Sequence, residues 1–125
     1  MVAERVMSTE RDPIYGCERW TGKLDKDGYG FHGRSRAHIV AWERERGVVA
    51  SGLELDHLCR RRNCVALHHL EPITRGENEK RKSWRYRARR THCPAGHELA
   101  VNRIVTPEGG AVCRACNRAA ESKST

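Results

Sequence analysis

The apolar positions between residues 20 and 50 come in short groups, and they predict a hairpin followed by one helix. The Asp27-Gly28 pair lies in a glycine-rich stretch and favours a tight hairpin or a meander. A helix then begins after Ser35, a plausible N-cap, and ends at Gly47. The side chains expected to pack from this helix are Ala37, Ile39, Val40 and Trp42.

Two short strands follow, separated by a basic turn. Apolar residues alternate at positions 53 and 55, which predicts a strand that delivers Asp56 and His57 at its end. The sequence CRRRNC at 59–64 is too short and too basic for regular structure. Residues 69–74 predict the returning strand, which ends near Pro72.

A second helix is predicted to begin at Thr74. Thr74 and Glu77 have the spacing of a capping box, in which each side chain satisfies an amide at the helix start. Asn78 then lies one turn inside the helix, on the same face as Arg81, Lys82, Arg85 and Arg89. Trp84 and Ala88 alone form the apolar flank, so we expect the second half of this helix to lie along DNA or in solvent.

Composition limits the hydrophobic core. The chain has 125 residues, of which 38% are hydrophobic, so one small domain with or without an appendage is expected. Trp20, Trp42 and Trp84 are expected in that core. The first 13 residues lack the apolar run of a signal peptide, and no stretch approaches a membrane span, so we expect a cytoplasmic protein. In a reducing compartment, cysteines near histidines indicate zinc more often than disulfides.

Six cysteines divide into two sets of three, each with a well-placed histidine, which predicts two structural Cys₃His zinc sites. The second set has two-knuckle spacing and consists of Cys93, His97, Cys113 and Cys116. The first set consists of Cys17, Cys59, Cys64 and His69, with His68 as an alternative donor. Zinc at the first set would pin the loop between the two strands.

A second kind of site is indicated within residues 55–81. Asp56, His57, His69 and Asn78 stand at intervals that suit a one-metal nuclease. A paired Asp-His can hold a divalent cation and activate a water, and an Asn from the following helix can complete the oxygen shell. The isolated histidines, among them His38, are given no catalytic role.

Charge points to a polyanionic partner. Lysines and arginines number 24 against 16 acidic residues, a formal net charge of +8, and residues 75–90 contain eight basic and two acidic side chains. The candidate DNA-binding residues are Arg60, Arg61, Arg62, Arg81, Lys82, Arg85 and Arg89.

These motifs together resemble the HNH endonucleases, particularly those of bacteriophages. The resemblance covers roughly residues 14–81 and rests on LDHLC at 55–59, CV at 64–65, HLEPIT at 69–74 and EN at 77–78. The cysteines and histidine after residue 91 resemble a zinc-binding extension on phage members. One departure is Ala66-Leu67, which stands where members of this cysteine-bearing group usually have Asn-Pro.

The resemblance implies an α+β protein with the ββα-metal fold, followed by a small zinc-ribbon-like module. His57 would be the general base, Asp56 and Asn78 would hold Mg²⁺ or a similar cation such as Mn²⁺, and His69 would orient the base or bind zinc. The implied domains are the nuclease at 14–90 and the module at 91–120, with flexible tails at 1–13 and 121–125.

Three functions remain open at this point. The first is a metal-dependent DNA endonuclease that nicks or cuts both strands, acting in an infected bacterial cell as a monomer or weak dimer. The second is a zinc-stabilised DNA-binding protein that has lost turnover through the Ala66-Leu67 change. The third, which rests on family analogy alone, is an accessory factor that binds phage packaging proteins.

Overall fold

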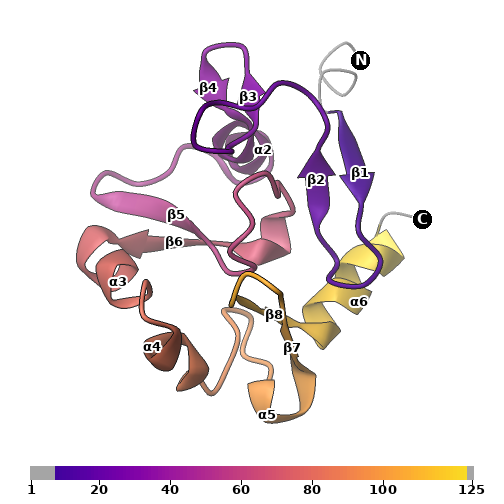
Figure 1. Cartoon of the computed structure of the whole chain (residues 1–125), viewed down its shortest axis with the longest axis vertical. Coiled ribbons are helices and arrows are strands. Elements are labelled where there is room, and N and C mark those ends of the chain that lie inside the picture. Colours follow the sequence, from indigo (N-terminus) through magenta and orange to yellow (C-terminus); the bar gives the residue numbers. More distant parts are fainter. Residues whose placement is uncertain (1–7, 124–125) are drawn as a thin grey trace.

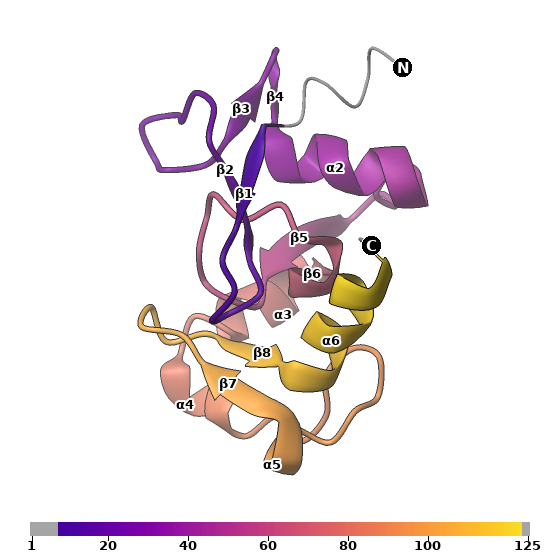
Figure 2. The same cartoon turned by 90° about the vertical axis from the view of Figure 1, so that its right-hand side faces the viewer.

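Four antiparallel hairpins, rather than one continuous sheet, hold the strands of the described chain (Figures 1 and 2). The structure is a computed structural model, and it describes residues 8–123. The strand pairs are β1 (Thr9–Arg11) with β2 (Glu18–Trp20), β3 (Phe31–His32) with β4 (Ser35–Arg36), β5 (Leu53–His57) with β6 (Leu70–Thr74), and β7 (Arg103–Val105) with β8 (Ala111–Cys113). The chain combines short strands and short helices, which confirms the predicted α+β class.

Short helices join these hairpins. They are α2 (Ala37–Arg46), the 3₁₀ helix η1 (Leu67–His69), α3 (Arg75–Lys80), α4 (Trp84–Ala88), α5 (Leu99–Asn102) and α6 (Arg114–Lys123). Gly47 ends α2 as predicted, with a φ of 84° and its amide bonded to the Glu43 carbonyl. The N-cap prediction is wrong, because Ser35 lies in β4 and Arg36 precedes the helix without a side-chain cap.

The β5–β6 hairpin and α3 form the predicted ββα unit. Asp56 pairs with Glu71 and His57 pairs with Leu70, so the acidic and imidazole side chains lie at the end of β5. Strand β6 does not end near Pro72 but continues to Thr74, which is possible because Pro72 occupies an edge strand of a two-stranded sheet. The Thr74 hydroxyl accepts the Glu77 amide at 3.1 Å and caps the start of α3, which is the first half of the predicted capping box. The Glu77 carboxylate instead accepts from Arg81 and Tyr86.

The predicted single helix after Thr74 is broken. It ends at Lys80 and resumes at Trp84 as α4. Arg81 turns inward at the break, and the Arg87 guanidinium donates to the freed carbonyls of Arg81 and Lys82 at 2.7 and 3.0 Å. The basic residues of 75–90 therefore do not share one continuous face with Asn78.

The C-terminal module packs directly on the turn at Cys59. The amide of Ala111 donates to the Leu58 carbonyl at 3.0 Å, and the Thr106 hydroxyl donates to the Cys59 carbonyl at 2.8 Å. Gly110 makes this approach possible, since a Cβ there would lie 2.4 Å from the Cys59 carbonyl carbon. The C-terminal module is thus packed against the first 90 residues through backbone and side-chain hydrogen bonds.

Parts of both predicted tails form regular structure. Strand β1 falls within 1–13, and α6 extends to Lys123 with Glu121 paired to Arg11 at 3.1 Å. Residues 1–7 and 124–125 of those tails lie outside the described chain. Within the part of the chain that is described, no helix combines the length and apolar character needed to cross a bilayer.

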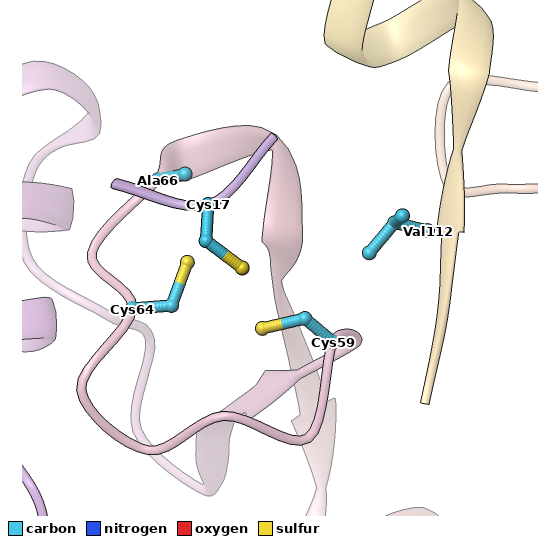
Figure 3. Packing of buried hydrophobic residues seen from close by; sticks show 5 residues of the cluster. All are labelled: Cys17, Cys59, Cys64, Ala66 and Val112. Atoms are coloured by element: carbon cyan, nitrogen blue, oxygen red, sulfur yellow. The ribbon is translucent and has the colours of Figure 1, made fainter. Parts of the chain in front are cut away.

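The core is small and rich in cysteine. One cluster contains Cys17, Cys59, Cys64, Ala66 and Val112, the last from the C-terminal module (Figure 3). A second contains Trp20, Ala37 and Val65. The expectation that Trp84 is a core residue is wrong, because Trp84 is 64% exposed on α4, whose residues are all at least partly exposed.

Candidate functional site: a basic cleft braced by two cysteine-histidine clusters

One open cleft gathers three of the four predicted active-site residues. Asp56 and His57 come from the end of β5, and Asn78 comes from α3. The remaining lining residues are Tyr29, Leu55, Arg60, Arg62, Lys82, Arg87 and Glu108. The fourth predicted residue, His69, is not in this cleft. Four basic side chains against two acidic ones give the cleft the charge expected of a phosphate-binding surface.

His57 is held in one orientation by the backbone. Its Nε2 lies 2.9 Å from the Cys64 carbonyl oxygen. A carbonyl only accepts hydrogen bonds, so Nε2 carries the proton and Nδ1 keeps a free lone pair. Burial lowers the pKa of His57 to about 4, so the ring is neutral at physiological pH and can accept a proton at Nδ1.

Two further rings surround His57. The His38 ring centroid lies 4.5 Å from that of His57, and Tyr29 lies 5.9 Å from His57 and 5.5 Å from His38. Burial, followed by the neighbouring His57, lowers the pKa of His38 to about 3. His38 and Tyr29 therefore form an uncharged wall behind the base, a position that the sequence analysis did not assign to either residue.

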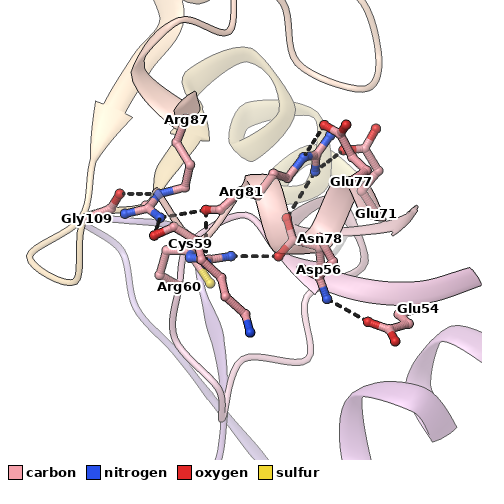
Figure 4. Close-up of polar contacts among 12 residues, drawn as sticks. Glu54, Asp56, Cys59, Arg60, Glu71, Glu77, Asn78, Arg81, Arg87 and Gly109 are labelled. Carbon is pink, nitrogen blue, oxygen red and sulfur yellow. Dashed lines mark hydrogen bonds and ion pairs between the residues drawn. The ribbon is translucent and has the colours of Figure 1, made fainter. Parts of the chain in front are cut away.

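The carboxylate of Asp56 is engaged on both oxygens (Figure 4). Arg60 binds Oδ1 at 2.7 Å and Arg81 binds Oδ2 at 3.0 Å. Arg81 also pairs with Glu71 at 2.7 Å and with Glu77 at 3.1 Å, so it lies buried among three carboxylates. This arrangement positions Asp56 firmly at the base of the cleft.

Asn78 is oriented by β5. Its amide nitrogen donates to Glu54 Oε1 at 2.7 Å (Figure 4), which assigns the amide nitrogen to Glu54 and leaves the oxygen as the atom suited to a cation. An Asp carboxylate and an Asn amide oxygen in one cleft are the donors that a hard divalent cation prefers. The donor set fits such a cation. Arg60 and Arg81 already bind the two carboxylate oxygens of Asp56, so a cation would have to displace one of these guanidinium groups.

The first predicted zinc set comes together in the core. The sulfurs of Cys17, Cys59 and Cys64 and a ring nitrogen of His69 all lie within 4.8 Å of one another (Figure 3 shows the three sulfurs converging). His69 Nδ1 lies 3.6 Å from Cys17 Sγ and 3.5 Å from Cys64 Sγ. Tetrahedral zinc with its usual bond lengths requires S···N separations of about 3.5 Å, so this cluster fits zinc.

The second predicted set also converges, in the C-terminal module. His97 Nδ1 lies 3.3 Å from Cys93, 3.5 Å from Cys113 and 3.4 Å from Cys116, measured to each sulfur. Cys93 and Cys116 are 3.7 Å apart between sulfurs, against about 3.8 Å for two thiolates on tetrahedral zinc. All six cysteines are free of disulfides.

Each cluster contains one thiol with a lowered pKa and one with a raised pKa. Hydrogen bonding from Cys59, and then from Cys64, lowers the pKa of Cys17, and the hydrogen bond to Cys17 raises the pKa of Cys59. Burial would raise the pKa of Cys93, but hydrogen bonds from the His97 and Ala95 backbone and from the Cys116 and His97 side chains together lower it to about 7. Burial raises the pKa of Cys116 to about 12. The thiolate is the form that binds zinc, so zinc binding at either cluster would release protons.

Asn117 links the two clusters. It follows Cys116 on α6, and its Oδ1 accepts from Nε2 of His69 at 2.9 Å and of His68 at 2.8 Å. Its Nδ2 donates to the Tyr15 carbonyl at 3.0 Å, which fixes the orientation of the amide. His69 therefore presents Nδ1 to the cysteines, whereas His68, the alternative donor, faces Asn117.

We expect Asn117→Ala to weaken zinc binding at the first cluster by about 10- to 100-fold, because a zinc-bound histidine depends on the acceptor at its other nitrogen. Asn117→Asp retains an acceptor oxygen and should hold zinc nearly as well as the wild type. The measurement is the rate of zinc transfer to a chromogenic chelator. Identical transfer from all three proteins would exclude this role for Asn117.

Of the seven predicted DNA-binding residues, five are exposed or partly exposed and two are buried. Arg62, Lys82, Arg85 and Arg89 are exposed, and Arg60 is partly exposed in the cleft. Arg61 is buried, with its guanidinium bound to Asp12 at 2.6 Å and Glu108 at 2.8 Å. Arg81 is buried as described above. Arg61 and Arg81 are therefore committed to ion pairs inside the protein, whereas the other five side chains are at least partly exposed.

Comparison with known proteins supports the resemblance drawn from the motifs. A family model described as HNH endonuclease matches residues 35–80, which include β5, β6 and α3. The uncharacterized gene 5.3 protein of Enterobacteria phage T3 is 34% identical over 41 residues. That match covers 33% of this chain and 41% of the phage protein. No solved structure matches this chain.

Proposed function

We propose that the chain is a metal-dependent endonuclease that hydrolyses phosphodiester bonds in DNA, because a family model described as HNH endonuclease matches residues 35–80. The observation that carries the proposal is the meeting of Asp56, His57 and Asn78 in one basic cleft. The phage origin of the matching relative supports action in an infected bacterial cell.

In the proposed reaction, His57 acts as general base. Its Nδ1 takes a proton from water, the oxygen attacks phosphorus, and the bond from phosphorus to the 3′ oxygen breaks. Asp56 and Asn78 would hold a divalent cation, Mg²⁺ or Mn²⁺, which when bound would stabilise negative charge on the phosphate and the leaving oxygen. The Cys64 carbonyl stabilises the protonated ring of His57 by keeping its hydrogen bond to Nε2.

We propose that zinc has a structural role at both clusters. The turn 58–64 carries two ligands of the first cluster and also the carbonyl that orients His57. A zinc ion there would restrain this turn and the chain that follows it, where Ala66-Leu67 stand in place of the usual Asn-Pro. His69 serves this cluster, so in our proposal it is a zinc ligand and does not touch substrate.

Asn78→Ala tests the cation site with little risk to the fold, since Asn78 is partly exposed on α3. We expect the rate of supercoiled plasmid nicking in Mg²⁺ to fall by at least about 10-fold, because the cation loses one oxygen ligand. Glu79→Ala, on the next residue and exposed, is the matched control and should nick at the wild-type rate.

The same assay distinguishes the alternative function. Salt-sensitive DNA binding by the wild-type protein without cleavage in Mg²⁺ or Mn²⁺ would support a zinc-stabilised DNA-binding protein instead. Equal nicking by the Asn78 variant and the wild type would remove Asn78 from the cation site.

A further inference from the structure

Arg60 has an unusual position for a residue assigned to DNA binding, because its charge is directed inward at the catalytic carboxylate. Its Nη1 lies 2.7 Å from Asp56 Oδ1, and its Nη2 lies 3.3 Å from the Arg81 carbonyl. A divalent cation bound by Asp56 would need a carboxylate oxygen, and Arg60 already binds Oδ1. In this state Arg60 and a cation compete for Asp56.

The two arginines on Asp56 differ in how firmly they are held. Arg81 pairs with three carboxylates and has a side chain 7% exposed. Arg60 pairs only with Asp56 among the acidic residues described, and its side chain is 20% exposed in the cleft. Arg60 is therefore the partner that can leave, while Arg81 keeps Asp56 in place.

Positive charge around Arg60 favours its transfer to an anion. The Arg81 carbonyl accepts from both Arg60 and Arg87, which brings two guanidinium groups to one oxygen. The charge of Arg60 also contributes to lowering the pKa of Arg87, after burial. A phosphate in the cleft would reduce the repulsion between the Arg60 and Arg87 guanidinium groups. It can also bind a guanidinium through two parallel hydrogen bonds.

The backbone at Arg60 also sets this residue apart. It has a φ of 58°, and within residues 8–123 it is the non-glycine residue with a positive φ. Left-handed backbone of this kind costs free energy for a residue with a Cβ and persists where the surrounding structure holds it. Here the conformation directs the Arg60 guanidinium toward Asp56, four residues earlier in the sequence, at the wall of the cleft.

We propose that Arg60 binds Asp56 in the free protein and moves to a DNA phosphate in the complex, so that DNA and the catalytic cation bind cooperatively. This inference rests on the proposed function, because it takes Asp56 as a cation ligand. Since coupling between two ligands is reciprocal, DNA should raise the affinity for the cation by the same factor that the cation raises the affinity for DNA. The protein would then assemble its cation site chiefly on its substrate.

The test is a Mn²⁺ titration of the zinc-loaded protein, followed by the electron paramagnetic resonance signal of free Mn²⁺. Titrations are made with and without a DNA duplex, in a His57→Ala background that prevents cleavage, and Mn²⁺ bound by the duplex alone is subtracted. We expect the duplex to raise Mn²⁺ affinity by about 5- to 150-fold. Arg60→Gln should raise the affinity of the DNA-free protein and largely remove the effect of the duplex.

Arg44→Gln is the matched control. Arg44 is an exposed arginine in the last turn of α2, does not line the cleft and is not among the candidate DNA-binding residues. This variant should show the wild-type Mn²⁺ affinity without DNA and the wild-type enhancement with it. A general loss of positive charge would instead change both variants equally and would overturn the specific role of Arg60.

Two outcomes separate this inference from the proposed function. If Mn²⁺ binds with the same affinity with and without DNA, and Arg60→Gln changes nothing, the exchange of Arg60 is refuted while the cation site stands. If Asp56→Asn binds Mn²⁺ as tightly as the protein with Asp56 in every condition, the cation site itself is wrong. Thermal denaturation of each variant checks that the fold is kept.

Discussion

His57→Ala should lower the rate of plasmid nicking by about 10²- to 10⁴-fold, the range that a positioned general base contributes. The physical reason is the fixed ring of His57, whose Nε2 proton is committed to the Cys64 carbonyl and whose Nδ1 is free to accept a proton. The lowered pKa, about 4, keeps the ring neutral across the physiological range. Rates are measured as first-order loss of supercoiled plasmid in Mg²⁺.

A second variant separates catalysis from structure. His57→Gln keeps an amide that can donate to the Cys64 carbonyl but offers no basic nitrogen, so it should be nearly as inactive as the Ala variant while keeping the wild-type zinc content. His92→Ala, an exposed histidine of the C-terminal module, should retain full activity. Wild-type nicking by either His57 variant would exclude His57 as the base.

Cys64→Ser should remove zinc from the first cluster and with it most of the folded state. Structural zinc contributes about 10–16 kcal/mol of apparent binding free energy in small zinc domains, against a total stability of about 5–15 kcal/mol for a typical domain. The small cysteine-rich core of this chain offers little to replace that contribution. The expected result is about one zinc fewer per chain and the loss of a cooperative thermal transition near physiological temperature.

Elemental analysis and circular dichroism check this prediction together. The wild-type protein should hold about two zinc ions per chain, one for each cluster. Removal of zinc by a strong chelator should reproduce the effect of the variant, and added zinc should restore the wild-type but not the variant protein. A Cys64→Ser protein with two zinc ions and an unchanged melting temperature would show that Cys64 is not a ligand.

Local patterns in the sequence were sufficient to predict the elements that carry Asp56, His57 and Asn78 in the cleft. Alternation at residues 53–57 predicted β5, and the Thr74 cap predicted the start of α3, so Asp56, His57 and Asn78 were placed correctly on their elements. Cysteine and histidine spacing predicted both clusters that the structure brings together. These features depend on neighbours a few residues away or on strict ligand geometry, which is why a single sequence reveals them.

Tertiary contacts account for what the sequence did not show. Arg61 was predicted to bind DNA from the basic turn, but it is buried in ion pairs with Asp12 and Glu108, which come from distant segments of the chain. The continuous basic helix is interrupted because Arg81 turns toward the acidic residues of the β5–β6 hairpin. Asn117 carries no local signal at all, since its role depends on α6 packing against η1.

The most direct test of nuclease function is a time course of supercoiled plasmid with the zinc-loaded wild-type protein, started by Mg²⁺ and followed by treatment with a DNA ligase. We expect relaxed circles to accumulate only when the divalent cation is present. The ligase should reseal them, because hydrolysis with a 3′ oxygen as leaving group produces a 3′ hydroxyl and a 5′ phosphate. DNA that is bound but remains supercoiled in both Mg²⁺ and Mn²⁺ would contradict the assignment of this cleft as a nuclease site.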